Sequence, residues 1–348
     1  MTLLSVFLVM MVVNWLIRHY VLLPKNLNKK SVVIMLWSPK LERQAIPALP
    51  DIRIDADIAN LSWAENYSAY YGIDFRREYS GLRHLIGGFD SAGERIAMQV
   101  FLLPNAHSTA FVYHGYYDHV GLFDNVINYF LKHGYSVVAY DMPGHGLSSG
   151  EAAAIDDFMR YRQVLNDAFT VVANFGLPAR RVGLAQSTGC AVLMSHLLSG
   201  GEGDFDRVVL MAPLLKPCDW WWGKPAHAVL KYFIHSLPRK FADNSDDQAF
   251  LEFLRERDPL QARTLPISWV GALKKWQPWF LKQAPVNSSV LILQGDADET
   301  VEWRYNLPRI KQKFPNAKVV FVPGAHHHLA KESEVYREQL WQACDDYF

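Results

Sequence analysis

Short apolar runs alternate with longer amphipathic segments along most of the chain. The runs are rich in Val, Ile and Leu, which is typical of strands buried on both faces. They cover residues 97–103, 110–114, 136–141, 181–186, 207–211, 289–294 and 318–322. Segments with helical periodicity lie between them, including 122–132, 155–175 and 188–198. The alternation predicts an α/β fold with a mostly parallel central sheet and helices on both faces.

Residues 215–285 interrupt this alternation. They contain no good core strand, yet they hold six of the eleven tryptophans: Trp220, Trp221, Trp222, Trp269, Trp276 and Trp279. An insertion between two strands of an α/β sheet lies above the carboxyl ends, where ligands bind. We therefore predict a helical cap at 215–285, with core segments at 61–214 and 286–348. The alternative is that these tryptophans only pack helices together.

The amino terminus is apolar over residues 2–17, apart from Ser5 and Asn14. Arg18-His19 then interrupt this run before further apolar residues complete a stretch of 2–23. As a helix this stretch would rise about 33 Å, enough for a hydrocarbon core of roughly 30 Å. We expect an uncleaved membrane anchor at 1–24 and a tether at 25–60. A cleaved signal peptide is the alternative, although no Lys or Arg precedes the apolar run. Basic residues that follow the run favour a cytoplasmic catalytic domain: Arg18, Lys25, Lys29 and Lys30.

Composition narrows the classes of function. The formal net charge is zero, so no basic field exists to hold nucleic acid, and we expect no such partner. The three cysteines, Cys190, Cys218 and Cys344, are widely spaced. They predict neither a disulfide framework nor a metal site. We expect neither a cofactor nor a metal.

The segment 182–190 reads as a buried strand that runs directly into a helix, with Ser187 at the turn. Small residues flank the serine at Ala185 and Gly189, as in the small-x-Ser-x-Gly nucleophile elbow that exposes a serine Oγ. The alternative is an ordinary N-cap serine.

Other polar motifs follow the remaining strands. His114-Gly115 ends one run, and an Asp-x-x-Gly-His-Gly-x-Ser motif at 141–148 follows the next. Downstream come Asp296 and Asp298, and then three histidines at 326–328. The order serine, acid, histidine is that of the α/β-hydrolases.

With these motifs, the chain resembles the α/β-hydrolase superfamily, and within it the monoacylglycerol lipase and lysophospholipase group, over roughly residues 60–345. The tripeptide at 258–260, Asp-Pro-Leu, is similar to one found in caps of this family. Two positions depart from the usual elbow: Ala185, where most relatives carry glycine, and Gln186, where histidine is frequent.

The resemblance implies a triad of Ser187, Asp298 and His327. A serine hydroxyl needs a histidine to remove its proton and a carboxylate to orient that histidine. The acid of the family lies three residues after Gly295, which favours Asp298 over Asp296. The family motif Gly-x-x-His-x-x-x-x-Glu aligns Gly324, His327 and Glu332. His326 and His328 are expected to pack beside the base.

The resemblance also implies an oxyanion hole formed by the backbone N–H groups of Tyr116 and Thr188. The candidate substrate-binding residues are His114, Gly115, Gln186, Trp220, Trp221 and Trp222. His114 is also a candidate for ordering its own loop.

Together these features predict a serine ester hydrolase that cleaves lipid-derived acyl esters, such as a monoacylglycerol or a lysophospholipid. The expected partners are a small acyl ester or lipid and, through the amino terminus, a membrane. Two alternatives remain. One is a short-chain carboxylesterase or thioesterase, and the other is a non-catalytic, membrane-tethered binding protein of the same fold.

Overall fold

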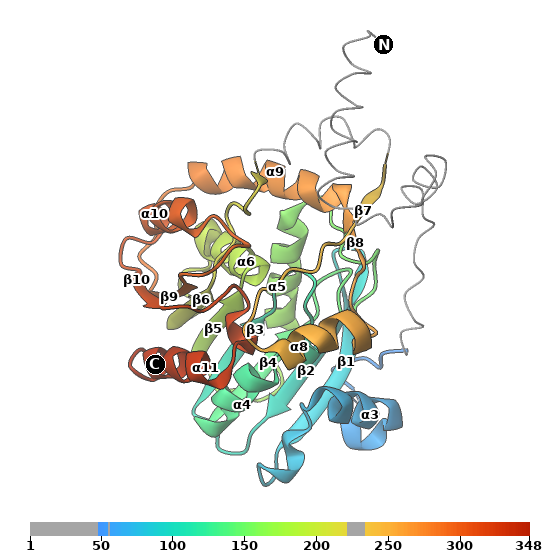
Figure 1. Cartoon of the computed structure of the whole chain (residues 1–348). Coiled ribbons are helices and arrows are strands. Elements are labelled where there is room, and N and C mark those ends of the chain that lie inside the picture. Colours follow the sequence, from blue (N-terminus) through green and yellow to red (C-terminus); the bar gives the residue numbers. More distant parts are fainter. Residues whose placement is uncertain (1–47, 55, 221–233) are drawn as a thin grey trace, which may run out of the picture.

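The computed structural model describes residues 48–54, 56–220 and 234–348 (Figure 1). The predicted anchor at 1–24, most of the predicted tether, and Trp221 and Trp222 lie outside the described residues. Within the described residues, no helix is both long and apolar enough to cross a membrane.

A sheet of eight strands forms the centre of the molecule, in the order β1-β2-β4-β3-β5-β6-β9-β10. The strands are β1 (Arg83–Ser91), β2 (Glu94–Leu102), β3 (Ser108–Tyr113), β4 (Tyr135–Tyr140), β5 (Arg181–Gln186), β6 (Arg207–Met211), β9 (Val290–Gly295) and β10 (Lys318–Val322). β2 pairs antiparallel with both β1 and β4, and all other neighbours are parallel. Each of the seven predicted runs is a strand of this sheet, and the predicted fold class is confirmed.

The edge strand β1 is the one strand of this sheet that the hydrophobic pattern missed. It contains Gly87 and Gly88, which lack the side chains that mark a strand in a sequence. Backbone hydrogen bonds to an upstream segment compensate: Gly88 donates to the carbonyl of Pro50 and accepts from the N–H of Ile52, at 2.7 and 3.2 Å. Tertiary pairing therefore stabilises a strand that local preference does not predict.

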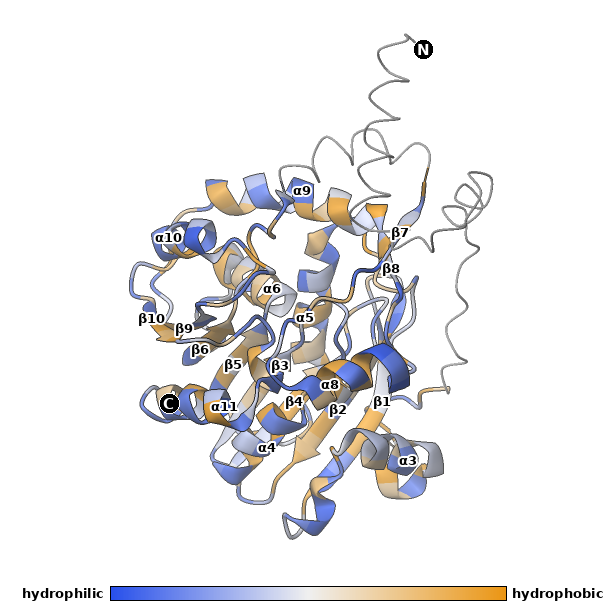
Figure 2. Cartoon of the chain, in the orientation of Figure 1, coloured by the Kyte–Doolittle hydropathy of each residue, from blue (hydrophilic) through white to orange (hydrophobic). Residues whose placement is uncertain are grey.

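Helices cover both faces of the sheet, because successive residues of each buried strand point to opposite sides. In β3, Phe111 and Tyr113 belong to one apolar cluster, whereas Ala110 and Val112 belong to the other. The first cluster includes α5 (Phe158–Val172), α6 (Thr188–His196) and α10 (Trp303–Lys313). The second includes α4 (Asp124–Lys132) and α11 (Glu334–Asp345). Figure 2 shows predominantly hydrophobic strands between helices of mixed hydropathy.

The described parts of 215–285 contribute no strand to the central sheet. They contain β7 (Ser236–Pro238) and β8 (Thr264–Pro266), which pair only with each other, together with α8 (Gln248–Glu252) and α9 (Ile267–Lys282). α9 packs on the core through Trp276, whose indole Nε1 donates to Ser195 Oγ at 2.8 Å.

Asp258 fastens this inserted segment to the core. Its carboxylate accepts from the Tyr71 hydroxyl at the end of α3 (Ser62–Tyr71), at 2.7 Å, and lies 3.1 Å from His119 Nε2. Burial alone would lower the pKa of His119, but the adjacent Asp258 carboxylate outweighs it and raises that pKa. The segment is therefore held by a buried ion pair.

Candidate active site

Ser187 occupies a strained turn between β5 and α6. Its φ of 53° and ψ of −110° are uncommon for a residue with a side chain, and such strain is typical of a nucleophile elbow. The turn is held by the Ser187 N–H, which donates to the Met211 carbonyl at 2.9 Å. A Cβ at Gly189 would lie 2.5 Å from the Tyr113 carbonyl oxygen, so only glycine fits there. The nearby backbone thus explains why glycine stands two residues after the serine.

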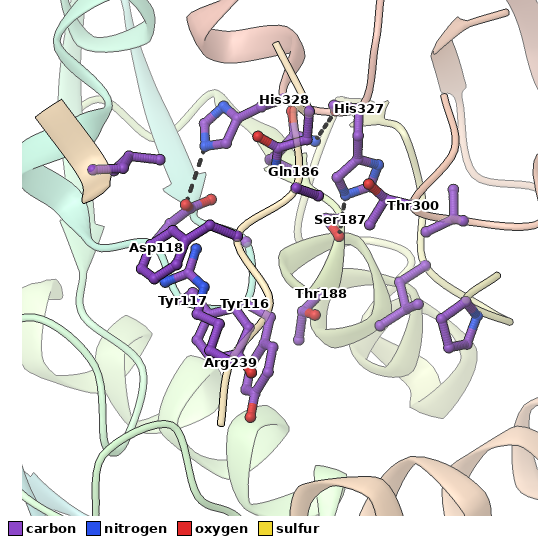
Figure 3. A pocket seen from close by; sticks show the side chains of 18 of the residues that line it. Tyr116, Tyr117, Asp118, Gln186, Ser187, Thr188, Arg239, Thr300, His327 and His328 are labelled. Carbon is purple, nitrogen blue, oxygen red and sulfur yellow. Dashed lines mark hydrogen bonds and ion pairs between the residues drawn. The ribbon is translucent and has the colours of Figure 1, made fainter. Parts of the chain in front are cut away.

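The structure brings Ser187, His327 and Asp298 together in one hydrogen-bonded chain (Figure 3). His327 Nδ1 lies 2.8 Å from Asp298 Oδ2, and His327 Nε2 lies 2.9 Å from Ser187 Oγ. Because a carboxylate only accepts, Nδ1 carries the proton and Nε2 is left to accept from the serine hydroxyl. This arrangement can remove the serine proton during attack on a carbonyl.

The environment of Asp298 keeps its carboxylate ionised. Burial alone would raise its pKa, but His327 and the backbone N–H groups of Val301 and Thr300 lower it below the usual value. Gln294, which the motif analysis did not single out, donates a further hydrogen bond to Oδ2 at 3.0 Å.

Asp296 has a different position. It accepts from the backbone N–H of Gly324 at 2.6 Å and thereby joins the turns that follow β9 and β10. A Cβ at Gly295 would overlap the carbonyl oxygens of Ala325 and His326. The glycine thus lets the loop that carries His327 approach the end of β9.

Replacing Asp298 by asparagine should lower kcat for ester hydrolysis by about three orders of magnitude or more, because an amide cannot stabilise the imidazolium that forms during attack. Asp296→Asn is the matched control and should cost less than about tenfold, since it only loosens a turn. Steady-state kinetics on folded variants, checked by circular dichroism, measure both. Equal losses would leave the acid unassigned.

The three consecutive histidines contact different residues. His327 faces Ser187, whereas His328 Nε2 lies 3.1 Å from Asp118 Oδ1. The backbone N–H of His326 donates to the fully buried Glu332, which also accepts from the N–H of Asp246 at 2.6 Å. Glu332 therefore links the loop that carries His327 to the inserted segment.

The pair of Asp118 and His328 joins the loop after β3 to the loop after β10. Both side chains are buried. Burial alone would raise the pKa of Asp118, but His328 more than compensates and lowers it to about 2. This pair was not foreseen, because nothing local in the sequence links positions 118 and 328.

Replacing Asp118 by asparagine should lower the free energy of unfolding by about 2 kcal/mol near pH 5. Its folded-state pKa lies below the unfolded value, so the ionised group stabilises the fold above about pH 4 and loses this effect as pH falls towards 2. Urea unfolding over a pH series should show the two proteins converging in that range. The exposed Asp90→Asn variant is the control, and a difference independent of pH would argue against the ion pair.

Tyr116 and Thr188, the two predicted oxyanion donors, line the same cavity as Ser187. Thr188 is the first residue of α6, so its N–H belongs to the helix end that lacks intrahelical acceptors. The loop of Tyr116 is fixed by its side chain, which stacks on Trp269 with 4.0 Å between ring centroids and donates its hydroxyl to the Ala153 carbonyl at 2.8 Å. α9 therefore supports the loop that carries one of the donors.

A cavity of about 160 Å³ opens above Ser187. One part of its lining is mainly apolar: Leu214, Pro217, Trp269 and Val301. Residues 239–255 of the inserted segment contribute eight more lining residues: Arg239, Lys240, Phe241, Ala242, Asn244, Leu251, Leu254 and Arg255. The cavity thus lies between the core and the inserted segment.

The predicted substrate-binding residues divide into two groups. Gly115 and Gln186 line the cavity, and Gln186 Nε2 also donates to the His327 carbonyl at 2.8 Å. His114 and Trp220 are not among the described residues that line it. His114 instead accepts from the Met142 N–H at 2.9 Å and so orders its own loop. Trp220 is packed in the core, whereas Trp269 both packs in the core and lines the cavity.

A family model described as serine aminopeptidase, S33 (Hydrolase_4) matches residues 104–334, well over half of the chain. The chain belongs to this family. The match spans β3 to the start of α11 and so includes all three residues of the candidate triad. Membership makes the protein a hydrolase of the α/β-hydrolase superfamily.

Individual relatives are more distant. A monoglyceride lipase homolog of monkeypox virus is 24% identical over 251 residues, which are 68% of this chain and 87% of that protein. A monoacylglycerol lipase of Mycolicibacterium smegmatis is 24% identical over 233 residues, or 64% of this chain and 81% of that protein. The crystal structure of Paleococcus ferrophilus monoacylglycerol lipase has a TM-score of 0.62 at 18% identity, covering 72% of this chain and 97% of that one. Family and relatives together indicate an enzyme that hydrolyses esters.

Proposed function

We propose that this hydrolase cleaves lipid-derived carboxylic esters through an acyl-enzyme formed on Ser187. The observation that carries the proposal is the continuous hydrogen-bonded chain from Ser187 Oγ through His327 to Asp298, beneath a cavity. The monoglyceride lipases among its relatives support an acyl ester as the substrate.

In the first half-reaction, His327 Nε2 takes the hydroxyl proton as Ser187 Oγ attacks the ester carbonyl carbon. The carbonyl oxygen becomes an oxyanion, which the N–H groups of Tyr116 and Thr188 stabilise. When the intermediate collapses, the carbon–oxygen bond to the alcohol breaks and His327 returns the proton to the leaving oxygen. The products are a free alcohol and an acyl-enzyme.

In the second half-reaction, water replaces the alcohol. His327 takes a proton from the water as the water attacks the acyl carbonyl, and returns it to Ser187 Oγ as the fatty acid leaves. The low pKa of Asp298 keeps that group anionic throughout, so it stabilises the imidazolium in both halves. Neither step needs a cofactor.

The apolar wall of the cavity suits an acyl chain. We expect kcat/KM to rise from acetate to at least octanoate, by up to about fourfold for each methylene that becomes fully buried. A series of p-nitrophenyl esters measures this directly. Trp269→Ala should weaken octanoate hydrolysis more than acetate hydrolysis, whereas Trp279→Ala, on the same helix but not lining the cavity, should not change the ratio. A preference for acetate that neither variant alters would favour a short-chain esterase.

Labelling with a fluorophosphonate tests the catalytic proposal against the non-catalytic alternative. A serine activated by His327 reacts covalently with this probe, and a serine that only caps α6 does not. Absence of labelling, together with absence of hydrolysis of both short and medium esters, would favour a binding protein.

A further inference from the structure

The cavity above Ser187 has an uneven distribution of charge, although the whole chain is neutral. Its lining contains three cations, Arg239, Lys240 and Arg255, and one carboxylate, Asp118. All three cations come from the inserted segment. Figure 3 shows Arg239, Tyr117 and Asp118 on one side of Ser187 and Thr300 on the other. We call these three cations the cationic wall; Arg239, the one that Figure 3 labels, lies on the Tyr117 side of Ser187.

Arg239 is held rigidly within this wall. Its guanidinium carbon lies 4.0 Å from the ring centroid of Tyr117 and 4.2 Å from that of Phe241. One guanidinium nitrogen, Nη1, donates to Gln261 Oε1 at 2.5 Å and to the Ala262 carbonyl at 3.2 Å. A guanidinium stacked on aromatic rings keeps its donors in one plane, ready for a carboxylate or phosphate.

The charge of this wall is neutralised only in part. Among the described residues, Asp118 forms its ion pair with His328, and Arg255 forms one with Asp243. No carboxylate of the described residues forms an ion pair with Arg239 or Lys240. Burial lowers the pKa of Arg239, which is the expected effect on a cation that has lost water without gaining a full counter-charge.

We propose that Arg239 and Lys240 bind an anionic group, a carboxylate or a phosphate, on the alcohol part of the ester substrate. The inference rests on the proposed ester hydrolysis and adds a charge preference to it. With the ester carbonyl at Ser187, the acyl chain lies along the apolar wall and the alcohol part lies along the cationic wall. Hydrolysis then releases a fatty acid and an alcohol that keeps its anionic group.

Esters that share one acyl chain and differ in charge test this proposal. The four substrates are octanoylglycerol, octanoylglycerol phosphate, O-octanoyl lactate and the methyl ester of O-octanoyl lactate, with released octanoate as the readout. The wild-type protein should prefer the phosphate over octanoylglycerol, or the lactate over its methyl ester, by about tenfold or more in kcat/KM. A preference for octanoylglycerol phosphate identifies phosphate as the bound group, and a preference for O-octanoyl lactate identifies carboxylate. Added salt should reduce the preference, because it screens the attraction.

Variants are compared by the same ratio of kcat/KM for charged over neutral ester, which cancels losses of active protein. Arg239→Met should lower the ratio about tenfold, and Arg239→Lys should lower it less, since lysine keeps the charge but not the planar fork. Lys240→Met should lower it by a smaller factor. Lys282→Met is the matched control, because Lys282 is exposed on α9 and does not line the cavity.

A wild-type ratio near one for both pairs, with the neutral esters hydrolysed, would overturn the charge preference and leave the ester hydrolase intact. A ratio that persists in both Arg239→Met and Lys240→Met would also overturn it. If Arg239→Met does not fold, the Lys240→Met ratio and the salt dependence of the wild-type ratio test the charge preference. Failure to hydrolyse any ester, including p-nitrophenyl octanoate, would remove the proposed function together with this inference.

Discussion

Replacing Ser187 by alanine should lower kcat for ester hydrolysis by about three orders of magnitude or more, because no other group can form the acyl-enzyme. Residual activity should come only from binding and from the oxyanion donors, whose backbone N–H groups the substitution keeps. Progress curves with p-nitrophenyl octanoate, recorded at high enzyme concentration, measure the loss. The same variant should no longer react with a fluorophosphonate.

Ser199→Ala is the control for this experiment, since Ser199 is exposed at the far end of the helical segment that follows Ser187. It should retain both activity and labelling. Full labelling of Ser187→Ala would mean that another serine reacts and that the strained turn at 187 has a structural role only.

Replacing His327 by alanine should cause a loss of similar size, because the serine then lacks an acceptor for its proton. His326→Ala is the matched control on the adjacent position. His326 contacts Glu332 through its backbone N–H, which alanine retains, and through ring Nδ1 at 3.4 Å, which alanine removes, so we expect a loss below about tenfold. Kinetics of the two variants over a range of pH give the comparison. If His326→Ala proved as damaging as His327→Ala, the base would be misassigned.

That the side chains of Ser187, Asp298 and His327 meet could be predicted from the sequence, because each residue lies in the turn or loop after a strand that is apparent from its apolar run. Ser187 follows β5, Asp298 follows β9 and His327 follows β10. Parallel strands place their carboxyl ends at one edge of the sheet, so their order and spacing in the chain are sufficient to bring the three residues together.

The cavity wall is much harder to predict. Asp118 and His328 are far apart in the chain and meet only after the sheet has formed. Among the tryptophans of the inserted segment, residue type does not distinguish Trp269, which lines the cavity, from Trp220, which is packed in the core. That difference depends on how α9 lies against the core, which local pattern does not encode. The edge strand β1 was not predicted for a related reason. Its glycines have no side chains to mark a strand, and backbone pairing with neighbouring segments stabilises it instead.

Gln261 links the buried Asp258 to the charged wall of the cavity. Its amide nitrogen donates to Asp258 at 2.9 Å, and its amide oxygen accepts from Arg239. Gln261 thus links the Arg239 guanidinium to the Asp258 carboxylate, which also contacts Tyr71 and His119 in the core. The cation proposed to bind the head group is therefore fixed by a buried carboxylate, whereas Ser187, Asp298 and His327 are carried by segments that follow strands. Substitutions in the cationic wall should therefore change the substrate preference while leaving Ser187, His327 and Asp298 in place.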